Sequence, residues 1–133
     1  MADTVRTLSA LQALLPDNSA RAISPQDERD FLVSALKRYN RTVTTTPTAL
    51  TTNDRDVFAD ATAGAITLTL PAASTCTNVE ITVIKIDAGA NDVIIDADGA
   101  ELINGGATLT LDLQWDCARL VCDGAAWYAF IGA

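Results

Sequence analysis

Residues Ala65–Ala73 read A-I-T-L-T-L-P-A-A, and this stretch sets the expected fold of the chain. Aliphatic side chains alternate with threonine, which is the two-residue period of a strand with one buried and one exposed face. Ile66, Leu68 and Leu70 point to one side, and the threonines point to the other. Pro71 ends the strand, because proline has no backbone N–H to donate. The pattern predicts a β-strand on an apolar core.

Similar short runs fill the chain from Thr42 onward, and no segment there keeps a helical period. Glycine, proline and aspartate separate the runs at the regular intervals of an all-β sandwich or barrel. The expected strands are 42–46, 55–60, 65–70, 79–86, 93–96, 102–103, 107–113, 117–122 and 125–131. We therefore expect a mainly β domain over residues 42–133, an antiparallel β-sandwich or barrel of jelly-roll type.

The last hairpin allows a more detailed prediction. Asp123-Gly124 is a favoured pair for a two-residue turn. Folding the chain about this pair places Leu120 opposite Trp127, in a row that faces the core. The other face of the hairpin then carries Arg119, Val121 and Tyr128.

The first part of the chain has a helical pattern instead. Leucines at helical spacing predict a short helix that ends at Pro16. A second helix is expected after Ser24, a good N-cap residue, with Pro25 at the first helical position. Its apolar face contains Phe31, Leu32, Ala35, Leu36 and Tyr39. Stripes this narrow do not form a core alone, so we expect residues 1–41 to form a two-helix arm that docks or oligomerises.

Charge separates the same two regions. Through Arg41 the chain has six basic and five acidic residues, and the remainder has three basic and twelve acidic residues, which together give the net charge of −8. A body this acidic repels nucleic acid, so we expect no nucleic-acid partner. Apolar runs are shorter than the roughly 18 residues of a membrane span, and the N-terminus lacks the pattern of a secretory signal. We expect no membrane partner and synthesis in the cytosol.

The three cysteines are expected to be buried, unreactive thiols. Their number is odd, and the chain has no histidine to complete a usual zinc site. Cys117 and Cys122 lie five residues apart on an expected strand, so their side chains should face opposite sides. Neither a disulfide framework nor a zinc site is predicted.

Few residues suggest catalysis. A serine or cysteine nucleophile normally needs a histidine base, and the chain has none. Lys85 lies in an apolar strand and is interpreted as a paired or snorkelling lysine. Asp96, Asp98 and Glu101 leave a bound cation or a glycosidase pair as alternatives, but their spacing does not fit an EF-hand loop and solvated turn residues are favoured. We expect no enzyme activity, no cofactor and no metal.

Apolar residues outside the expected core indicate subunit contacts. Trp115 follows an expected strand and precedes Asp116, which suits a subunit contact or, as an alternative, a glycan-binding platform. Short strands leave edges and the helical arm presents apolar faces, and symmetric association buries both. The predicted interface residues are Leu8, Leu11, Leu15, Phe31, Leu32, Leu36, Tyr39 and Trp115.

The order of the segments carries a further signal. A threonine-rich strand is followed by G-A-I-T-L-T-L-P-A-A, V-E-I-T-V-I-K-I-D, N-D-V-I-I-D-A-D-G-A-E-L-I-N-G, A-T-L-T-L and L-V-C-D-G-A-A-W-Y. This series, from Thr42 to the end, resembles a β-module widespread in tailed bacteriophages. The earlier stretch L-Q-A-L-L-P-D-N-S-A-R-A-I-S-P-Q-D-E-R-D resembles the helical lead found ahead of such modules in phage virion proteins.

The resemblance implies a virion structural protein, commonly a homotrimer, with no catalysis and no cofactor. Within that class we expect a capsid decoration (cement) protein, assembled in the host bacterial cytoplasm, that binds the major capsid protein or another virion protein. The alternative is a tail fibre or tailspike component that mediates virion attachment or binds a host glycan. The short chain has no heptads or repeats from which to build a shaft, which favours decoration.

Overall fold

A computed structural model describes residue 26, residues 29–32 and residues 39–132. The chain divides into two units, Met1–Arg38 and Tyr39–Ala133, and the expected boundary between residues 41 and 42 falls inside a strand. The described residues of the first unit, Gln26 and 29–32, are helical. The two-helix arm is not supported, because the helix expected before Pro16 lies outside the described residues and only one helical stretch is described.

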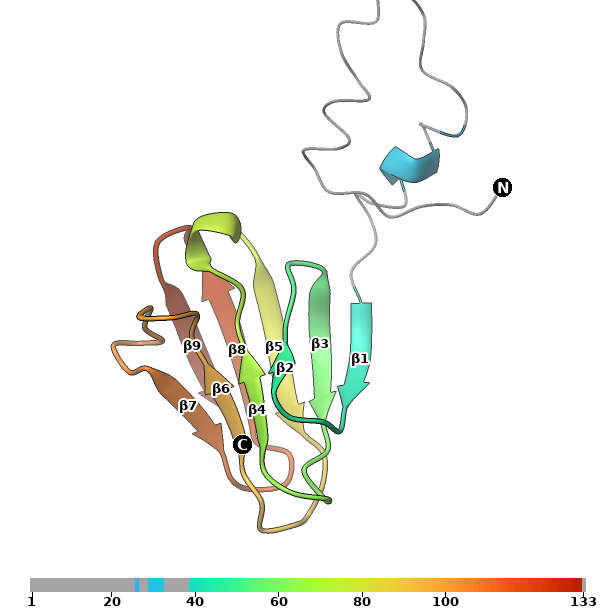
Figure 1. Ribbon diagram of the computed structural model, residues 1–133, viewed down its shortest axis with the longest axis vertical. Coiled ribbons are helices and arrows are strands. Elements are labelled where there is room, and N and C mark those ends of the chain that lie inside the picture. Colours follow the sequence, from blue (N-terminus) through green and yellow to red (C-terminus); the bar gives the residue numbers. More distant parts are fainter. Residues whose placement is uncertain (1–25, 27–28, 33–38, 133) are drawn as a thin grey trace, which may run out of the picture. The chain divides into compact units, whose positions relative to one another are not determined.

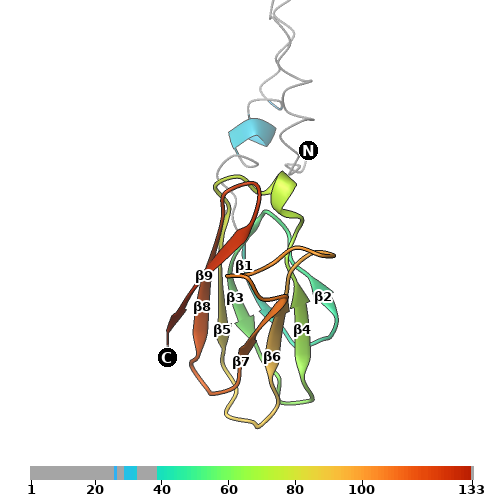
Figure 2. The same ribbon diagram turned by 90° about the vertical axis from the view of Figure 1, so that its left-hand side faces the viewer.

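The second unit is a β-sandwich of two open sheets (Figures 1 and 2). The five-stranded sheet has the order β1-β3-β5-β8-β9, and the four-stranded sheet has the order β2-β4-β6-β7. Because neither sheet closes on itself, the alternative of a barrel is wrong. The strands are β1 (Tyr39–Val43), β2 (Thr48–Ala49), β3 (Asp54–Ala59), β4 (Ile66–Thr69), β5 (Glu80–Lys85), β6 (Val93–Asp96), β7 (Thr108–Leu111), β8 (Cys117–Cys122) and β9 (Trp127–Gly132), with a 3₁₀ turn at Ala73–Thr75.

The prediction of an antiparallel, jelly-roll-type arrangement is also wrong, because both sheets are mixed. Up to β6 the chain crosses to the other sheet after every strand, so β1, β3 and β5 lie parallel, as do β2, β4 and β6. The later pairs β6–β7, β5–β8 and β8–β9 are antiparallel. A half-buried strand followed by a turn has one sequence pattern, whether the turn returns to the same sheet or crosses to the other.

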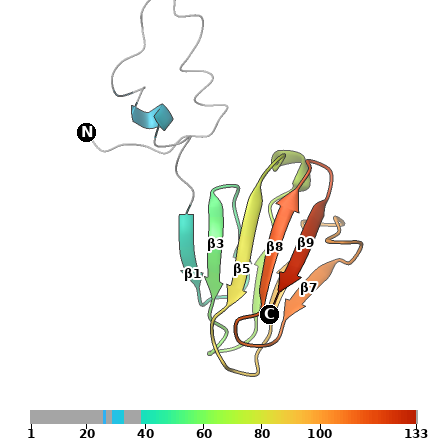
Figure 3. The same cartoon turned by 180° about the vertical axis from the view of Figure 1, so that it is seen from behind.

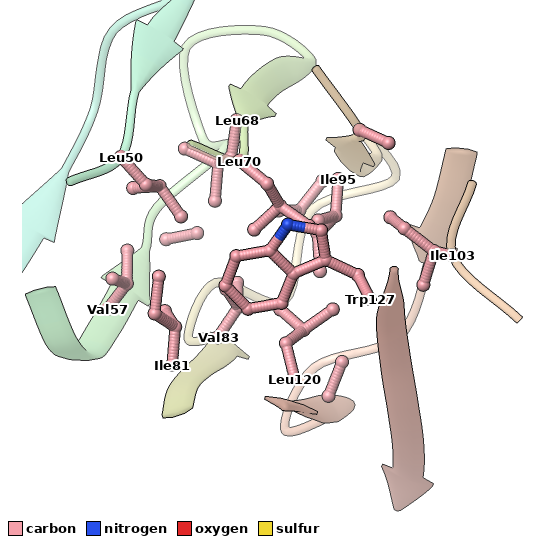
Figure 4. Close-up of a cluster of buried hydrophobic side chains, with 14 of the residues drawn as sticks. Leu50, Val57, Leu68, Leu70, Ile81, Val83, Ile95, Ile103, Leu120 and Trp127 are labelled. Carbon is pink, nitrogen blue, oxygen red and sulfur yellow. The ribbon is translucent and has the colours of Figure 1, made fainter. Parts of the chain in front are cut away.

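The inward-facing rows of the two sheets meet in one apolar core (Figure 4). Trp127 lies among aliphatic side chains from both sheets and is fully buried. Its indole Nε1 donates a hydrogen bond to the carbonyl oxygen of Pro71 at 3.1 Å, which satisfies the one polar atom of the side chain. Ile66, Leu68 and Leu70 are buried as well. The strand predicted from the alternation of residues 65–70 and the core position of Trp127 are both confirmed.

The β8–β9 hairpin has a register two residues away from the predicted one. Cys122 pairs with Trp127, whereas a turn about Asp123-Gly124 would place Leu120 opposite Trp127. The carboxylate of Asp123 accepts the backbone N–H groups of the two residues after Gly124, at 2.8 and 2.9 Å. The chain therefore reverses one residue later than predicted. A shift of two residues leaves each side chain on its predicted face.

Candidate functional site: the outer face of the five-stranded sheet

Figure 3 shows the five-stranded sheet from the side that points away from the core. Large apolar side chains lie on this outer face. Phe58 of β3 lies beside Ile84 of β5, and Val121 of β8 lies beside Tyr128 of β9. Phe130 follows on the same side of β9, because alternate residues of a strand share a face. Phe130 is 63% exposed and Tyr128 is 45% exposed, while the other three are partly buried. We call these five residues the apolar face.

Charged side chains on the same surface are paired. The Nη2 of Arg119, on β8, donates to the carboxylate of Glu80 at 2.6 Å, and this hydrogen bond raises the pKa of the guanidinium. The guanidinium carbon of Arg119 lies 5.9 Å from the centre of the Phe130 ring, within the range of a cation–π contact. On β3, the Nε of Arg55 lies 3.6 Å from a carboxylate oxygen of Asp56. Two acidic side chains are thus matched by two arginines.

The loop between β7 and β8 adds exposed apolar surface at one end of this sheet. Trp115 is 60% exposed and Leu113 is 64% exposed. The backbone N–H of Trp115 donates to the carbonyl of Lys85 at 2.8 Å, which fixes the loop against the end of β5. The carboxylate of Asp116 accepts the backbone N–H of Leu113 at 2.9 Å. The loop holds both apolar side chains outward on a hydrogen-bonded backbone.

Asn104 covers part of the free edge of β9. Its side-chain Nδ2 donates to the carbonyl of Ala129 at 2.8 Å, and its Oδ1 accepts the N–H of Ala129 at 3.0 Å. The backbone N–H of Asn104 donates to the carbonyl of Trp127 at 3.2 Å. The amide takes the place of a peptide group from a neighbouring strand. Since open edges invite pairing with another chain, this part of β9 is protected from edge-to-edge pairing.

The outer face of the four-stranded sheet has a different chemistry. Threonines of β4 and β7 flank the two outward residues of β6, one of which is the aspartate Asp96. Ile94 is the large apolar side chain among the outward residues of β4, β6 and β7. The outward residues of these three strands are Thr67, Thr69, Ile94, Asp96, Thr108 and Thr110.

The residues predicted to form an interface are spread over both units. Phe31 and Leu32 lie in the helical stretch and are 39% and 54% exposed. Tyr39 was expected on the apolar face of a helix, and this is wrong: it begins β1, and its N–H donates to the carbonyl of Asn53 at 2.7 Å. Trp115 lies in the β7–β8 loop. The remaining four, Leu8, Leu11, Leu15 and Leu36, lie outside the described residues.

The structure does not bring Tyr39 and Trp115 together. Tyr39 pairs with Asp54 at the start of β3, whereas the Trp115 loop bonds to Lys85 at the end of β5. Because β1, β3 and β5 are parallel, these positions lie at opposite ends of the sheet. A contact role for either residue stays a prediction.

Sequence reasoning missed the apolar face as a site, although it placed Val121 and Tyr128 on the correct side of the hairpin. The available signal was the run Trp127–Ile131, W-Y-A-F-I, which is apolar on both faces of its strand. A strand that is apolar on both faces is typical of burial on both sides. Within the described residues only the inward side of β9 packs on the core.

Lys85 and Asp87 form a buried ion pair, so the interpretation of Lys85 as a paired lysine is confirmed. The Nζ of Lys85 lies 2.6 Å from Asp87 Oδ2 and is fully buried. Asp87 also accepts the N–H groups of Ala61 and Gly89, at 2.8 and 2.9 Å. Desolvation by burial opposes ionisation, but the hydrogen bond from Lys85 and the two backbone donors outweigh it and lower the pKa of Asp87. The pair joins two loops at one end of the sandwich.

The other carboxylates considered for chemistry do not converge. Both oxygens of Glu101 accept the N–H of Ala73, at 2.9 and 3.1 Å, which ties the carboxylate to the start of the 3₁₀ turn. Asp96 lies on the outer face of the four-stranded sheet, and Asp98 lies in an exposed turn. Among the residues that the structure describes, no group of three histidine, cysteine, aspartate or glutamate side chains is placed to hold a metal ion.

The cysteines are free thiols in two environments. Cys76 and Cys122 are buried, and burial raises the pKa of both thiols. Cys117 is partly exposed and lies beside Ile84 on the outer side of the five-stranded sheet. The prediction that Cys117 and Cys122 face opposite sides of their strand is confirmed, whereas the burial expected for all three holds for two.

Comparison with known proteins assigns no family. Neither a protein-family model nor a curated protein matches the chain. In the part of the chain that the structure describes, no helix has the length and apolar character needed to cross a membrane.

Proposed function

We propose that this chain is a non-catalytic structural protein of a tailed-bacteriophage virion that decorates the head shell as a homotrimer. The apolar face is the observation that carries the proposal. Surface apolar residues scattered singly are normal, but neighbouring ones such as Val121 and Tyr128, with Phe130 next on the same strand, are typical of an interaction site. The resemblance of the segments from Thr42 onward supplies the phage context.

The positions of the polar side chains support a non-catalytic role. Catalytic acids and bases usually gather in a cleft with perturbed pKa values. Here the buried pair of Lys85 and Asp87 joins loops, and Glu101 and Asp116 bind backbone N–H groups. Each of these groups is explained by the hydrogen bonds that stabilise the fold.

A decoration protein needs one surface that adheres and another that stays hydrated. The apolar face suits adhesion, and the threonines of the four-stranded sheet suit exposure to water. The partners of this proposal are further copies of the chain and the major capsid protein or another virion protein, without nucleic acid or membrane. Contacts to the shell are assigned to the first unit, where Phe31 and Leu32 are exposed. Repetition of weak contacts by symmetry gives persistent attachment.

Imaging of purified virions tests this proposal. An antibody against residues 39–132 should label the heads of particles, and a chain that lacks residues 1–38 should fold but fail to join them. Label on the tail would support a fibre component instead of a decoration protein. Particles whose protein content lacks this chain would contradict both.

A further inference from the structure

We infer that the apolar face is a self-association surface, and that its occupant is the five-stranded sheet of another copy of this chain. This inference deepens the proposed function and rests on the part of it that has copies of the chain associate. It does not depend on a location in the virion. It assigns the contact between copies to the β domain, whereas all but one of the interface residues predicted from sequence precede Arg41.

The protected edge of β9 favours contact through side chains. At β9, another copy could associate through the strand edge or through the outward sheet face. The hydrogen bonds from Asn104 occupy backbone groups of Trp127 and Ala129, so an added strand would have to displace them. Tyr128 and Phe130, on the outward side of the same strand, are left available to a partner that packs face to face.

Charge favours a second copy of this chain as the partner. Residues 39–132 contain twelve acidic and four basic residues, so two copies repel each other over most of their surface. The apolar face is an exception, because Glu80 is paired with Arg119 and Asp56 with Arg55. A copy that approaches through this face meets balanced charge and apolar side chains.

The area of the sheet is sufficient for a specific contact. Five strands about 4.8 Å apart, with about six residues each at 3.3 Å, present a flat area of about 500 Å². Two such faces bury roughly 1,000 Å² before side-chain relief is counted, which reaches the lower limit of specific interfaces. Trp115 and Leu113, in the loop at one end of the sheet, are exposed apolar side chains in addition to this area.

Sedimentation of the full chain with matched substitutions tests the inference. Phe130→Glu places a charge on the apolar face, and Thr110→Glu places the same charge at an exposed position on the other sheet. We expect the wild-type chain and Thr110→Glu to sediment as the same oligomer. Phe130→Glu should shift to monomer, with a dissociation constant raised at least about tenfold. Tyr128→Lys, which introduces the opposite charge, should also dissociate the oligomer while circular dichroism reports a folded sheet.

The outcomes separate the inference from the proposed function. A wild-type chain that is monomeric up to roughly 1 mM would overturn the inference, as would equal dissociation by Phe130→Glu and Thr110→Glu. A trimer sensitive to Phe130→Glu supports the inference and the homotrimer. A dimer with the same sensitivity supports the inference and contradicts the homotrimer. Association through this face in a protein that never labels virions supports the inference and contradicts the proposed function.

Discussion

The two outer faces of the sandwich follow the same alternation along the chain but carry opposite chemistry. On the five-stranded sheet, the outward rows contain Phe58, Ile84, Val121, Tyr128 and Phe130. Threonine is the commonest outward residue of β4 and β7 on the four-stranded sheet. Alternation therefore predicts which residues share a face, and the apolar side chains of one face are the reason that we propose it as the side that meets a partner.

Both sheets pack on one core. The largest loss of stability is expected when the buried ion pair between Lys85 and Asp87 is broken. Lys85→Ala removes the ammonium group and leaves the buried carboxylate of Asp87 without its partner. We expect a loss of about 3–5 kcal/mol in the free energy of unfolding, measured by urea denaturation.

The matched control for that prediction is an ion pair on the apolar face. Arg119→Ala breaks the exposed pair with Glu80 and should change the urea midpoint only slightly, because exposed pairs are screened by water. Equal losses for Lys85→Ala and Arg119→Ala would contradict the structural role assigned to the buried pair.

The backbone of the β8–β9 turn determines which side of the sheet Tyr128 occupies. Gly124 has φ +95°, and an added Cβ would lie 2.6 Å from Thr77 Oγ1. Gly124→Ala should therefore lower the free energy of unfolding by about 1–3 kcal/mol. Gly106→Ala, whose Cβ would meet only ordinary contacts, serves as the control and should cost less. Indistinguishable melting midpoints would contradict the assigned turn.

Low pH should weaken the buried ion pair of Lys85 and Asp87 in the wild-type chain. The pKa of Asp87 is lower in the folded protein than its ordinary value of about 3.9. A carboxyl of this kind contributes stability above the unfolded pKa and loses that contribution as the pH falls through the folded pKa. The urea midpoint of the wild-type chain should fall below about pH 4, and Asp87→Asn should fall less over the same range. A pH dependence that is unchanged in Asp87→Asn would contradict the assignment.

A substitution at Asn104 tests whether this side chain prevents copies from associating through the edge of β9. Asn104→Gly keeps a residue that tolerates the positive φ of this position but removes the two side-chain hydrogen bonds to Ala129. The cost should be about 1 kcal/mol in unfolding free energy, with increased light scattering as the β9 edge becomes available. Unchanged scattering would show that Asn104 does not protect the edge.

The sequence predicted the strands better than their connections. Val93–Asp96 and Cys117–Cys122 occur at their predicted bounds, and Trp127 and Leu68 are in the core, because burial on one face leaves a period of two. The crossing between sheets up to β6 was not predictable in this way, since local alternation contains no information on which strand lies alongside. The turn lies one residue later than predicted, because the carboxylate of Asp123 accepts two backbone N–H groups. The Asp-Gly pattern does not specify these hydrogen bonds.

The candidate site was predictable in part. Trp115 was singled out because it lies beside Asp116 between two expected strands, and the structure shows it exposed. Phe58 and Ile84 were not singled out, because they lie on different strands and become neighbours only through the parallel pairing of β3 with β5. A surface assembled from separate strands requires the register, which the sequence alone does not contain.

The reactivity of Cys117 tests the adhesive role of the apolar face most directly. Its thiol lies beside Ile84 on that side of the sheet, while Cys76 and Cys122 are buried. If copies associate through this face, the rate at which a maleimide modifies Cys117 in the wild-type chain should fall as the protein concentration rises. A thiol moved to the other face, by Cys117→Ser with Thr110→Cys, should react at a rate that does not depend on concentration. A Cys117 rate that is constant from dilute to concentrated protein would contradict the account.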